Sequence, residues 1–475
     1  MIKSLYSRKK ASISYDQKDL LEGPLLIKII RFVIPLLCTN LLQMCYSAAD
    51  MIVVGLSPVK GAIGAIGTTT AMINLILNTF TGFALGTTVV VARNIGKNDK
   101  KATENSVHTA LMLGSIAGFI CLGIGIFVSR PTLAFLGDEG RILDLATLYT
   151  TIYFLGAPFL SLTNFFIAIF RAKGDTKTPL FVLTVTGVLN VGLNLLFVLV
   201  FNMSVDGVAV ATVISNIAST VILCLRLSTD ESWIQFRFNK LQINRDSARE
   251  ILRDGLPAAL QGAFFSISNM IIQSSIIGLN NIYCPGGSGI IDGNAAGTSL
   301  EGFAYTATNS VCQASVTFTS QHYGAKKYER IGLVMRCCYL VTACIAIIAT
   351  LILVPFRIPL IKLYVSEQIA IDTGALRLLI LLAPYFLLAF MEVGSGIVRG
   401  LSKPVASTAV TLTGCCTFRI IWIFFVYPHF QTLECIYISY PISWGITALC
   451  HFIFAVVTRN KLIRNTDPNG NETVS

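Results

Sequence analysis

Charged residues are scarce in this sequence. Lys, Arg, Asp and Glu make up 13% of its 475 residues, whereas 54% of the residues are hydrophobic and the mean hydropathy is +0.70. A soluble chain of this length carries about twice that charged fraction. This composition excludes most classes of soluble enzyme and predicts that most of the chain lies within a lipid bilayer.

Patterns for metal binding and covalent catalysis are also missing. The four histidines are scattered, and no Cys-x-x-Cys pair occurs among the 13 cysteines. Most of the cysteines stand inside apolar stretches, so we interpret them as small buried hydrophobic residues. We therefore expect a protein that is not an enzyme, with no catalytic residues and no metal site.

Long hydrophobic runs, in contrast, are abundant. A helix that spans a bilayer needs about 20 mostly apolar residues, and twelve such stretches follow one another along the chain. We place them at residues 26–56, 62–91, 104–129, 145–170, 178–201, 206–227, 255–281, 291–319, 332–354, 374–398, 404–427 and 436–458. The sequence thus predicts an all-α polytopic membrane protein with twelve transmembrane helices. The basic segment before the first run is longer than the n-region of a signal peptide, so we expect the first helix to be retained.

The basic residues predict the orientation of these helices. With both termini in the cytoplasm, 29 of the 36 Lys and Arg residues fall on the cytoplasmic side, and Arg419 stands inside a span. The opposite side holds six, namely Lys60, Arg130, Arg141, Arg357, Lys362 and Arg377. Such an excess is typical of cytoplasmic loops. We expect a multi-pass protein of the plasma (inner) membrane, and we assign the net charge of +11 to topology and not to nucleic-acid binding.

The chain is built from two similar halves. Four short motifs recur in the same order, each 222 to 228 residues further on: Ile34-Pro35 and Leu256-Pro257, Gly96 and Gly324, Ala157-Pro158 and Ala383-Pro384, Arg171 and Arg399. The long polar segment 228–254 separates the halves. We therefore divide the chain into a cytoplasmic segment 1–25, a first lobe 26–227, a linker 228–254, a second lobe 255–458 and a cytoplasmic tail 459–475. Two copies of six helices share one membrane orientation, so the lobes are expected to be pseudo-symmetric about an axis along the membrane normal.

Several motifs resemble those of the multidrug and toxic compound extrusion (MATE) family, in particular its prokaryotic branch with the DNA-damage-inducible efflux proteins. They are Gly23-Pro24, Phe32-Val-Ile-Pro35, Tyr46-Ser-Ala-Ala-Asp50, Ala92-Arg-Asn-Ile-Gly96, Arg171-Ala-Lys-Gly-Asp175, Val205-Asp-Gly-Val-Ala-Val-Ala-Thr212, Gln321-His-Tyr-Gly324 and Gly394-Ser-Gly-Ile-Val-Arg399. The resemblance covers about residues 20 to 460.

Membership of this family implies a monomeric exporter in the lipid bilayer. Its substrate would be a cationic or amphipathic small molecule, and inward flow of H⁺ or Na⁺ would drive export without any further cofactor. A lipid-linked saccharide flippase of the same superfamily is an alternative, but it needs several cationic groups to hold diphosphate, and Arg419 alone stands clearly inside the membrane. A passive channel is a further alternative.

Asp50 is the strongest candidate for the coupling group, because ionisable residues inside a membrane are costly and mark function. It stands about 28 Å beyond Arg31 along the first helix, in its outer half. Asn190 and Asn194 share one face of the fifth span, and Thr212 in the sixth span lies at a similar depth. The resemblance also places the coupling site on these three helices. Such a group of oxygens suits a proton relay or a hard cation, although amide hydrogen bonds that only tighten the lobe are an alternative.

Other candidates are distributed over both lobes. Asn164 and Glu392 occupy matching positions, seven residues before Arg171 and Arg399. We add Asn164 to the coupling group, and we treat Glu392 either as the acidic group of the second lobe or as the partner of Arg399 or Arg419. Glu301 is expected to be solvated at the outer mouth.

Four further residues are assigned to the substrate cavity. Two arginines and two glycines are assigned structural roles. The cavity candidates are Gln43, Tyr46, Gln261 and Phe265. Arg171 and Arg399 are interpreted as anchors of cytoplasmic turns. Gly82 and Gly86 are expected to allow close helix packing.

Overall fold

The computed structural model describes residues 19–55, 62–135 and 140–465. In the first half, a 3₁₀ turn at Asp19–Leu21 precedes the helices. These are α2 (Leu25–Gly55), α3 (Ala62–Gly96), α4 (Lys100–Phe135), α5 (Gly140–Leu155), α6 (Ala157–Lys173), α7 (Lys177–Leu195), with a π-helical turn at Leu196–Val200, and α8 (Val205–Ser228).

The second half repeats this order. A 3₁₀ turn at Phe238–Lys240 leads to α9 (Arg245–Tyr283), α10 (Gly289–Gly324), α11 (Tyr328–Leu353), α12 (Arg357–Lys362), α13 (Gln368–Leu382) and α14 (Phe386–Gly400). One further span combines α15 (Pro404–Thr411), α16 (Phe418–Ile421) and α17 (Tyr427–Phe430) with π-helical turns at Leu412–Thr417 and Trp422–Val426, and α18 (Leu433–Arg464) completes the described chain.

The twelve predicted spans all correspond to helices. Nine described helices are long and apolar enough to cross a membrane, and two bent pairs raise this number to eleven. The bends are 50° between α5 and α6 and 54° between α13 and α14. The remaining span is α10, whose central residues are rich in Thr, Ser, Asn and Gln because it faces the interior of the protein.

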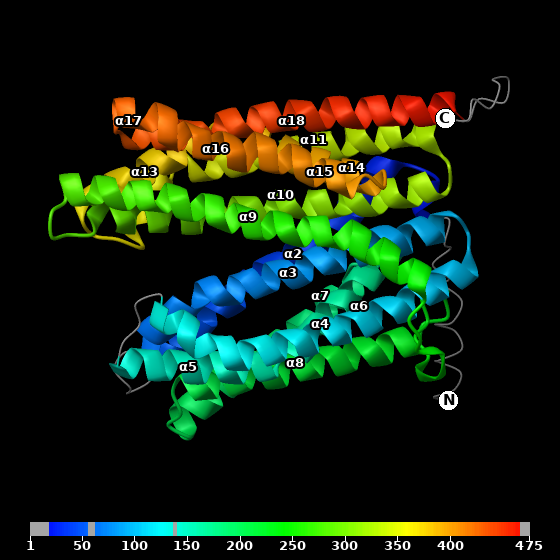
Figure 1. Ribbon diagram of the computed structural model, residues 1–475, viewed down its shortest axis with the longest axis horizontal. Helices are drawn as coiled ribbons and strands as arrows, with labels where there is room; N and C mark the ends of the chain where they lie inside the picture. Colours follow the sequence, from blue (N-terminus) through cyan, green and yellow to red (C-terminus); the bar gives the residue numbers. More distant parts are fainter. Residues whose placement is uncertain (1–18, 56–61, 136–139, 466–475) are drawn as a thin grey trace.

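The helices form two lobes that lie one above the other in Figure 1, with α2 to α8 in one and α9 to α18 in the other. The helix α2 connects them. Leu25 and Leu36 in its first half pack with Phe318 and other second-lobe residues, whereas Val53 near its end packs with Tyr149 of the first lobe.

The helix α9 crosses between the lobes in the corresponding way. Ile251 in its first turns belongs to a hydrophobic cluster of the first lobe, and Ile272 and Ile276 belong to one of the second lobe. Pro35 and Pro257, the prolines of the repeated motif, stand inside α2 and α9 near the crossings. A proline interrupts the helical hydrogen bonds and allows the helix to bend there.

The lobes contact each other closely at one end, which we call the closed end and define by Arg93, Gly96, Gln321, Gly324 and Ser402. A Cβ on Gly96 would lie 2.1 Å from the carbonyl oxygen of Gln321, and one on Gly324 would lie 2.0 Å from that of Arg93. Gly82 and Gly86 also lie close to the backbone of α9, where a Cβ would meet backbone atoms at 2.5 Å and 2.4 Å. The prediction that Gly82 and Gly86 permit close helix packing is confirmed.

The helix α9 contains the predicted span 255–281 but begins earlier, at Arg245, where the Asn244 side chain caps it by accepting a hydrogen bond from the Ser247 amide. One expectation about local structure was wrong. Several cysteines predicted to be buried lie instead on exposed helix surfaces, among them Cys38, Cys45, Cys344 and Cys450. An apolar run cannot distinguish the side of a helix that faces lipid from the side that faces protein.

Candidate functional site: a buried carboxylate and a central cavity

Asp50 is connected to two other helices by a series of hydrogen bonds. Asn194 on α7 donates from Nδ2 to Asp50 Oδ1 at 2.5 Å and to Asn190 Oδ1 at 3.3 Å. Asn190 Nδ2 donates to Thr212 Oγ1 on α8 at 3.4 Å, and the Thr212 hydroxyl donates to the Val208 carbonyl at 2.9 Å. We call these four side chains the Asp50 chain.

Local packing holds the Asp50 chain in place. The ring of Tyr46, one turn before Asp50, rests against Gly187 of α7, where a Cβ would lie 1.9 Å from the ring. The Tyr46 hydroxyl donates to the Thr184 carbonyl at 3.3 Å. This contact fixes α2 against α7, so that Asp50 meets Asn194, which is fully buried.

One oxygen of the Asp50 chain is left without a partner. Asn194 Oδ1 is buried and accepts no hydrogen bond from the described residues. A buried carbonyl oxygen without a donor carries a desolvation cost of about 1–3 kcal/mol. It is therefore available to accept a hydrogen bond when the proton content of the site changes.

The structure brings together four of the five predicted coupling residues. Asn164 is the exception, because it lies on α6, donates to the Leu160 carbonyl at 2.9 Å and lines a separate cavity. Its sequence position matched Glu392, and both residues indeed face this cavity. The sequence repeat thus correctly paired Asn164 with Glu392. The prediction that Asn164 belongs to the coupling group of Asp50 was wrong.

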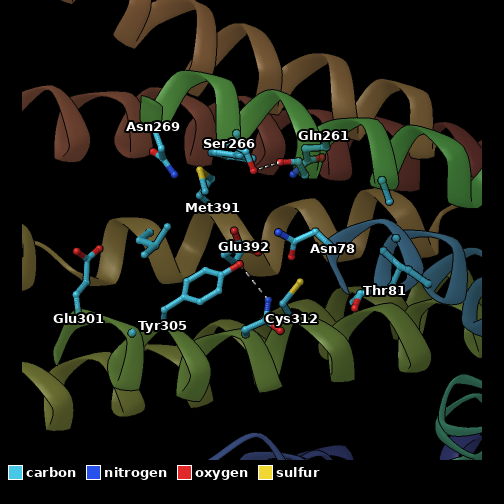
Figure 2. Close-up of a pocket in the computed structure, with 18 of the residues that line it drawn as sticks. Asn78, Thr81, Gln261, Ser266, Asn269, Glu301, Tyr305, Cys312, Met391 and Glu392 are labelled. Carbon is cyan, nitrogen blue, oxygen red and sulfur yellow. Dashed lines mark hydrogen bonds between the residues drawn. The ribbon is translucent and has the colours of Figure 1, made fainter. Parts of the chain in front are cut away.

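The cavity has a volume of about 610 Å³ and lies among α3, α6, α9, α10 and α14. Figure 2 shows that side chains of α9 and α10 face each other across it, with Met391 and Glu392 of α14 in the same region. The labelled residues of α9 are Gln261, Ser266 and Asn269, and those of α10 are Glu301, Tyr305 and Cys312. An apolar wall completes it, formed by Phe265, Ile272, Ile276, Leu388, Met391 and Trp444.

Two of the four predicted cavity residues line this space, namely Gln261 and Phe265. Gln43 and Tyr46 are not among the described residues that line it. Both stand on α2, which crosses between the lobes, and the Tyr46 ring is held against α7 instead. Glu392 lines the cavity, where it lies near Cys312 and Arg399.

The charged residues of the cavity were largely missed by the sequence analysis. Arg377, expected on the outer face, is buried and donates to Glu301 at 2.7 Å and to Asn294 at 2.9 Å. Glu301 is consequently paired and not solvated. The position of Arg377 inside the predicted span 374–398 was the signal for its burial.

The paired arginines of the sequence repeat also face this cavity. Arg171 and Arg399 stand at the ends of α6 and α14 and line it from opposite lobes, although they were interpreted as anchors of surface turns. Arg399 donates to Gln261 at 2.7 Å and is 8% exposed. The cavity therefore contains four arginines, including Arg419, and two glutamates.

This architecture defines a membrane transporter of two six-helix lobes with a polar cavity between and within them. Comparison with known proteins identifies its family. The family profile of MatE matches residues 35–196 and 257–425, one match in each lobe. The chain belongs to this family, and the resemblance of the sequence motifs is confirmed.

The relatives of this chain are distant but span most of its length. It is 24% identical to the probable multidrug resistance protein NorM of Thermotoga maritima over 85% of this chain and 86% of that protein. It is also 24% identical to the probable multidrug resistance protein YoeA of Bacillus subtilis, over 88% of this chain and 90% of that protein. A solved structure of a multidrug resistance MATE family transporter in an outward-facing conformation matches with a TM-score of 0.86 and 20% identity, over 95% of this chain and 100% of that one.

Proposed function

We propose that this protein is a secondary active multidrug exporter that moves amphipathic small molecules across the plasma membrane by alternating access, in exchange for protons. Membership of the MatE family and the two relatives named as multidrug resistance proteins support this proposal. They favour it over a lipid-linked saccharide flippase. The chain acts as a monomer, since its two lobes together enclose the cavity.

Both termini lie in the cytoplasm, and the closed end faces the same side. The support for this orientation is the excess of basic residues at that end, which include Arg93, Lys97, Lys326 and Lys327. A closed cytoplasmic end corresponds to an outward-facing state of the transporter. The cavity then exchanges with the exterior, where the substrate is released and the coupling ion enters.

The single observation that carries the coupling mechanism is the Asp50 chain, which joins a membrane carboxylate to polar groups on two neighbouring helices. In the ion-free state the Asp50 carboxylate accepts the hydrogen bond from Asn194 Nδ2. When Asp50 takes a proton from the exterior, it becomes a donor, and a half-turn of the Asn194 amide presents Oδ1 to receive it. The unpartnered Asn194 Oδ1 is satisfied in that state.

The same helix that carries Asp50 also reaches the other lobe. The first half of α2 packs against α10 and α11, and its second half carries Asp50 and packs against α7. A change of the hydrogen bond between Asp50 and Asn194 therefore acts on an element that both lobes share. This connection links protonation to the relative position of the lobes.

A proton suits this site better than Na⁺. The Asn190 Oδ1 and Thr212 Oγ1 atoms already accept hydrogen bonds within the Asp50 chain. A sodium ion needs several oxygen ligands at once, as hard cations do, so it would have to displace these hydrogen bonds. A proton on Asp50 reverses the bond to Asn194 and releases the weaker bond from Asn194 to Asn190, but it needs no further oxygen ligand.

The proposal is tested with everted membrane vesicles that contain the full chain and a fluorescent drug. A pH gradient and a Na⁺ gradient are imposed separately. We expect transport with the pH gradient alone, and no gradient-driven transport by the Asp50→Asn variant at equal protein content. Normal transport by this variant would refute the coupling role of Asp50.

A matched control uses another aspartate of the first lobe. Asp144 forms an exposed ion pair with Arg130 at 3.1 Å, away from the Asp50 chain. The Asp144→Asn variant removes the same charge and should transport like the wild type. If the Na⁺ gradient alone drives transport, the coupling ion is Na⁺ and the proposed coupling to protons is wrong.

A further inference from the structure

The cavity carries an excess of positive charge. Its lining contains Arg171, Arg377, Arg399 and Arg419 against Glu301 and Glu392, and the described lining residues include no Lys, Asp or His. With both glutamates ionised, the walls carry two more positive than negative charges. Burying uncompensated charge is expensive, and proteins pair such groups or supply them with a ligand of opposite charge.

One of the four arginines forms a direct ion pair within the protein, and Arg399 lies close enough to Glu392 for the two opposite charges to attract each other. Arg377 forms an ion pair with Glu301 at 2.7 Å and donates to Asn294. The ion pairs among the described residues include none of the other three arginines, nor Glu392. Arg399 donates only to the neutral amide oxygen of Gln261, and its Nε is buried without a partner.

Arg419 is buried and held in place at the wall of the cavity. It is 3% exposed, and its Nε donates to Ser443 Oγ at 3.0 Å. Its guanidinium carbon lies 4.1 Å from the centre of the Tyr440 ring, which also contacts Arg377 at 5.5 Å. The two terminal nitrogens of Arg419 have no hydrogen-bond partner among the described residues. A guanidinium fixed in this way offers two parallel donors, which is the geometry that a carboxylate or phosphate accepts.

We propose that the cavity binds its substrate through an anionic group, with Arg419 as the primary contact and Arg399 as a second positive group. The apolar wall of Phe265, Leu388, Met391 and Trp444 receives the rest of the molecule. The substrate class is thus an amphipathic organic acid with an apolar body and a carboxylate. This inference rests on the proposed export function, because it names the substrate of that same cavity.

The experiment compares three dansyl compounds that share one apolar ring system and differ in the charge of the head group. They are dansylglycine, an anion, dansylglycinamide, which is neutral, and dansylcadaverine, a cation. Binding is followed by dansyl fluorescence with the purified full chain in nanodiscs of phosphatidylcholine. We expect dansylglycine to bind at least about tenfold more tightly than its amide, as for a hydrogen bond to a charged group. Equal affinities of the acid and the amide would overturn the proposal.

Variants locate the anionic contact. Arg419→Gln should lower the preference for dansylglycine about tenfold, and Arg419→Lys, which keeps the charge but loses the planar fork, should retain part of it. Arg130→Gln removes the same charge from an exposed ion pair and should leave the preference unchanged. If Arg419→Gln does not fold, as judged by gel filtration, Arg399→Gln takes its place. An unchanged preference in a folded cavity variant would overturn the assignment.

Two further arms distinguish a soluble substrate from a bound lipid, and the substrate class from the export function. A lipid headgroup could supply the same anionic chemistry, so the measurement is repeated in nanodiscs that contain phosphatidylglycerol. Retained dansylglycine binding supports a soluble substrate, whereas its loss assigns the site to lipid and overturns the proposal. Gradient-driven export of dansylcadaverine without preference for dansylglycine would refute this inference and leave the proposed function standing. Preferential binding of dansylglycine without gradient-driven transport of any probe would refute the proposed function alone.

Discussion

Arg93 of the first lobe donates a hydrogen bond from Nη1 to Ser402 Oγ of the second lobe across 2.7 Å. The same guanidinium forms ion pairs with Glu250 at 2.7 Å and with Asp254 at 3.5 Å, both on α9. A second polar contact across the closed end runs from Gln321 Nε2 to the Ala172 carbonyl at 2.7 Å. Opening the closed end requires these contacts to break, so they set the stability of this conformation.

We expect Arg93→Gln to destabilise the closed end. The Asp254 side chain is fully buried, and the loss of a partner leaves its charge poorly compensated, at a cost of about 3 kcal/mol. Amide hydrogen exchange, followed by mass spectrometry, should become faster in the first turns of α9 and at the end of α14. Unchanged exchange in both segments would contradict a role for Arg93 in closing the lobes.

Arg253→Gln is the matched control for this prediction. Arg253 contacts the same Asp254 carboxylate at 3.1 Å, but it belongs to the same helix, and 55% of its side chain is exposed. Its loss therefore also leaves the buried Asp254 charge less compensated, but it keeps the contact of Arg93 with Ser402 between the lobes. The control variant should therefore speed exchange in the first turns of α9 only, and should leave the end of α14 unchanged.

A second prediction concerns the reciprocal contact of Gly96 with Gln321 and of Gly324 with Arg93. A Cβ on Gly96 would overlap a backbone oxygen of the other lobe, which cannot move without separating α3 from α10. Such overpacking costs about 1–3 kcal/mol. Gly96→Ala should lower the rate of drug export because it disfavours the closed cytoplasmic end.

Gly192→Ala provides the comparison, because a Cβ on this α7 glycine would meet nothing within 4 Å. Replacing a helical glycine by alanine without a clash stabilises a helix by up to about 1 kcal/mol. Export by Gly192→Ala should match the wild type. A Gly96→Ala variant that exports equally well would show that the close approach is dispensable.

The Asp50 chain predicts a graded effect of substitution. Asn194→Leu removes the direct donor to Asp50, whereas Thr212→Val removes only the last hydroxyl, at a cost of about 1 kcal/mol. Proton-driven export should therefore fall more in Asn194→Leu than in Thr212→Val. Thr186→Val is the control. Thr186 also joins α7 to α8, because it accepts a hydrogen bond from the Ser219 hydroxyl at 2.8 Å, but it is not part of the Asp50 chain. Equal losses in all three variants would indicate a general packing defect.

Much of the fold could be predicted from hydrophobic runs and from the sequence repeat. The runs located the twelve spans, and the fixed offset between Gly96 and Gly324 identified two residues that the structure places in the same interlobe contact. The position of Asp50 level with Asn190, Asn194 and Thr212 followed from helical rise alone. These inferences succeeded because they depend on spacing within single helices.

The parts that could not be predicted depend on how helices face one another. Arg377 and Arg399 looked like surface residues because sequence position near a helix end does not show which neighbours cover it. Tyr46 was assigned to the cavity, although its ring packs on Gly187. The crossing of α2 and α9 between the lobes likewise left no signal beyond Pro35 and Pro257, since an apolar face packs equally well on either lobe.

An ion pair outside the membrane predicts how stability depends on pH. Lys173, at the end of α6, contacts Asp230, which follows α8, at 2.6 Å. Burial alone would raise the pKa of Asp230, but the hydrogen bonds from Lys173 and Ser232 outweigh it and hold the pKa below its usual value. The unfolded chain therefore binds more protons than the folded one in acid, and stability rises with pH in that range.

Asp230→Asn should reveal this contribution as a difference in thermal unfolding temperature from the wild type, measured in detergent micelles from about pH 6 to about pH 3. The difference should be constant above about pH 4, near the ordinary pKa of an unfolded aspartate, and should shrink as the pH falls through the lower pKa of the folded state. Removing a charge-assisted hydrogen bond costs about 1.5–3 kcal/mol, so the variant should unfold at a lower temperature at neutral pH. Asp144→Asn, in an exposed pair, should show no difference at any pH. A difference for Asp230→Asn that persists unchanged to the lowest pH would contradict the ion pair as its cause, because a lost packing contact does not titrate.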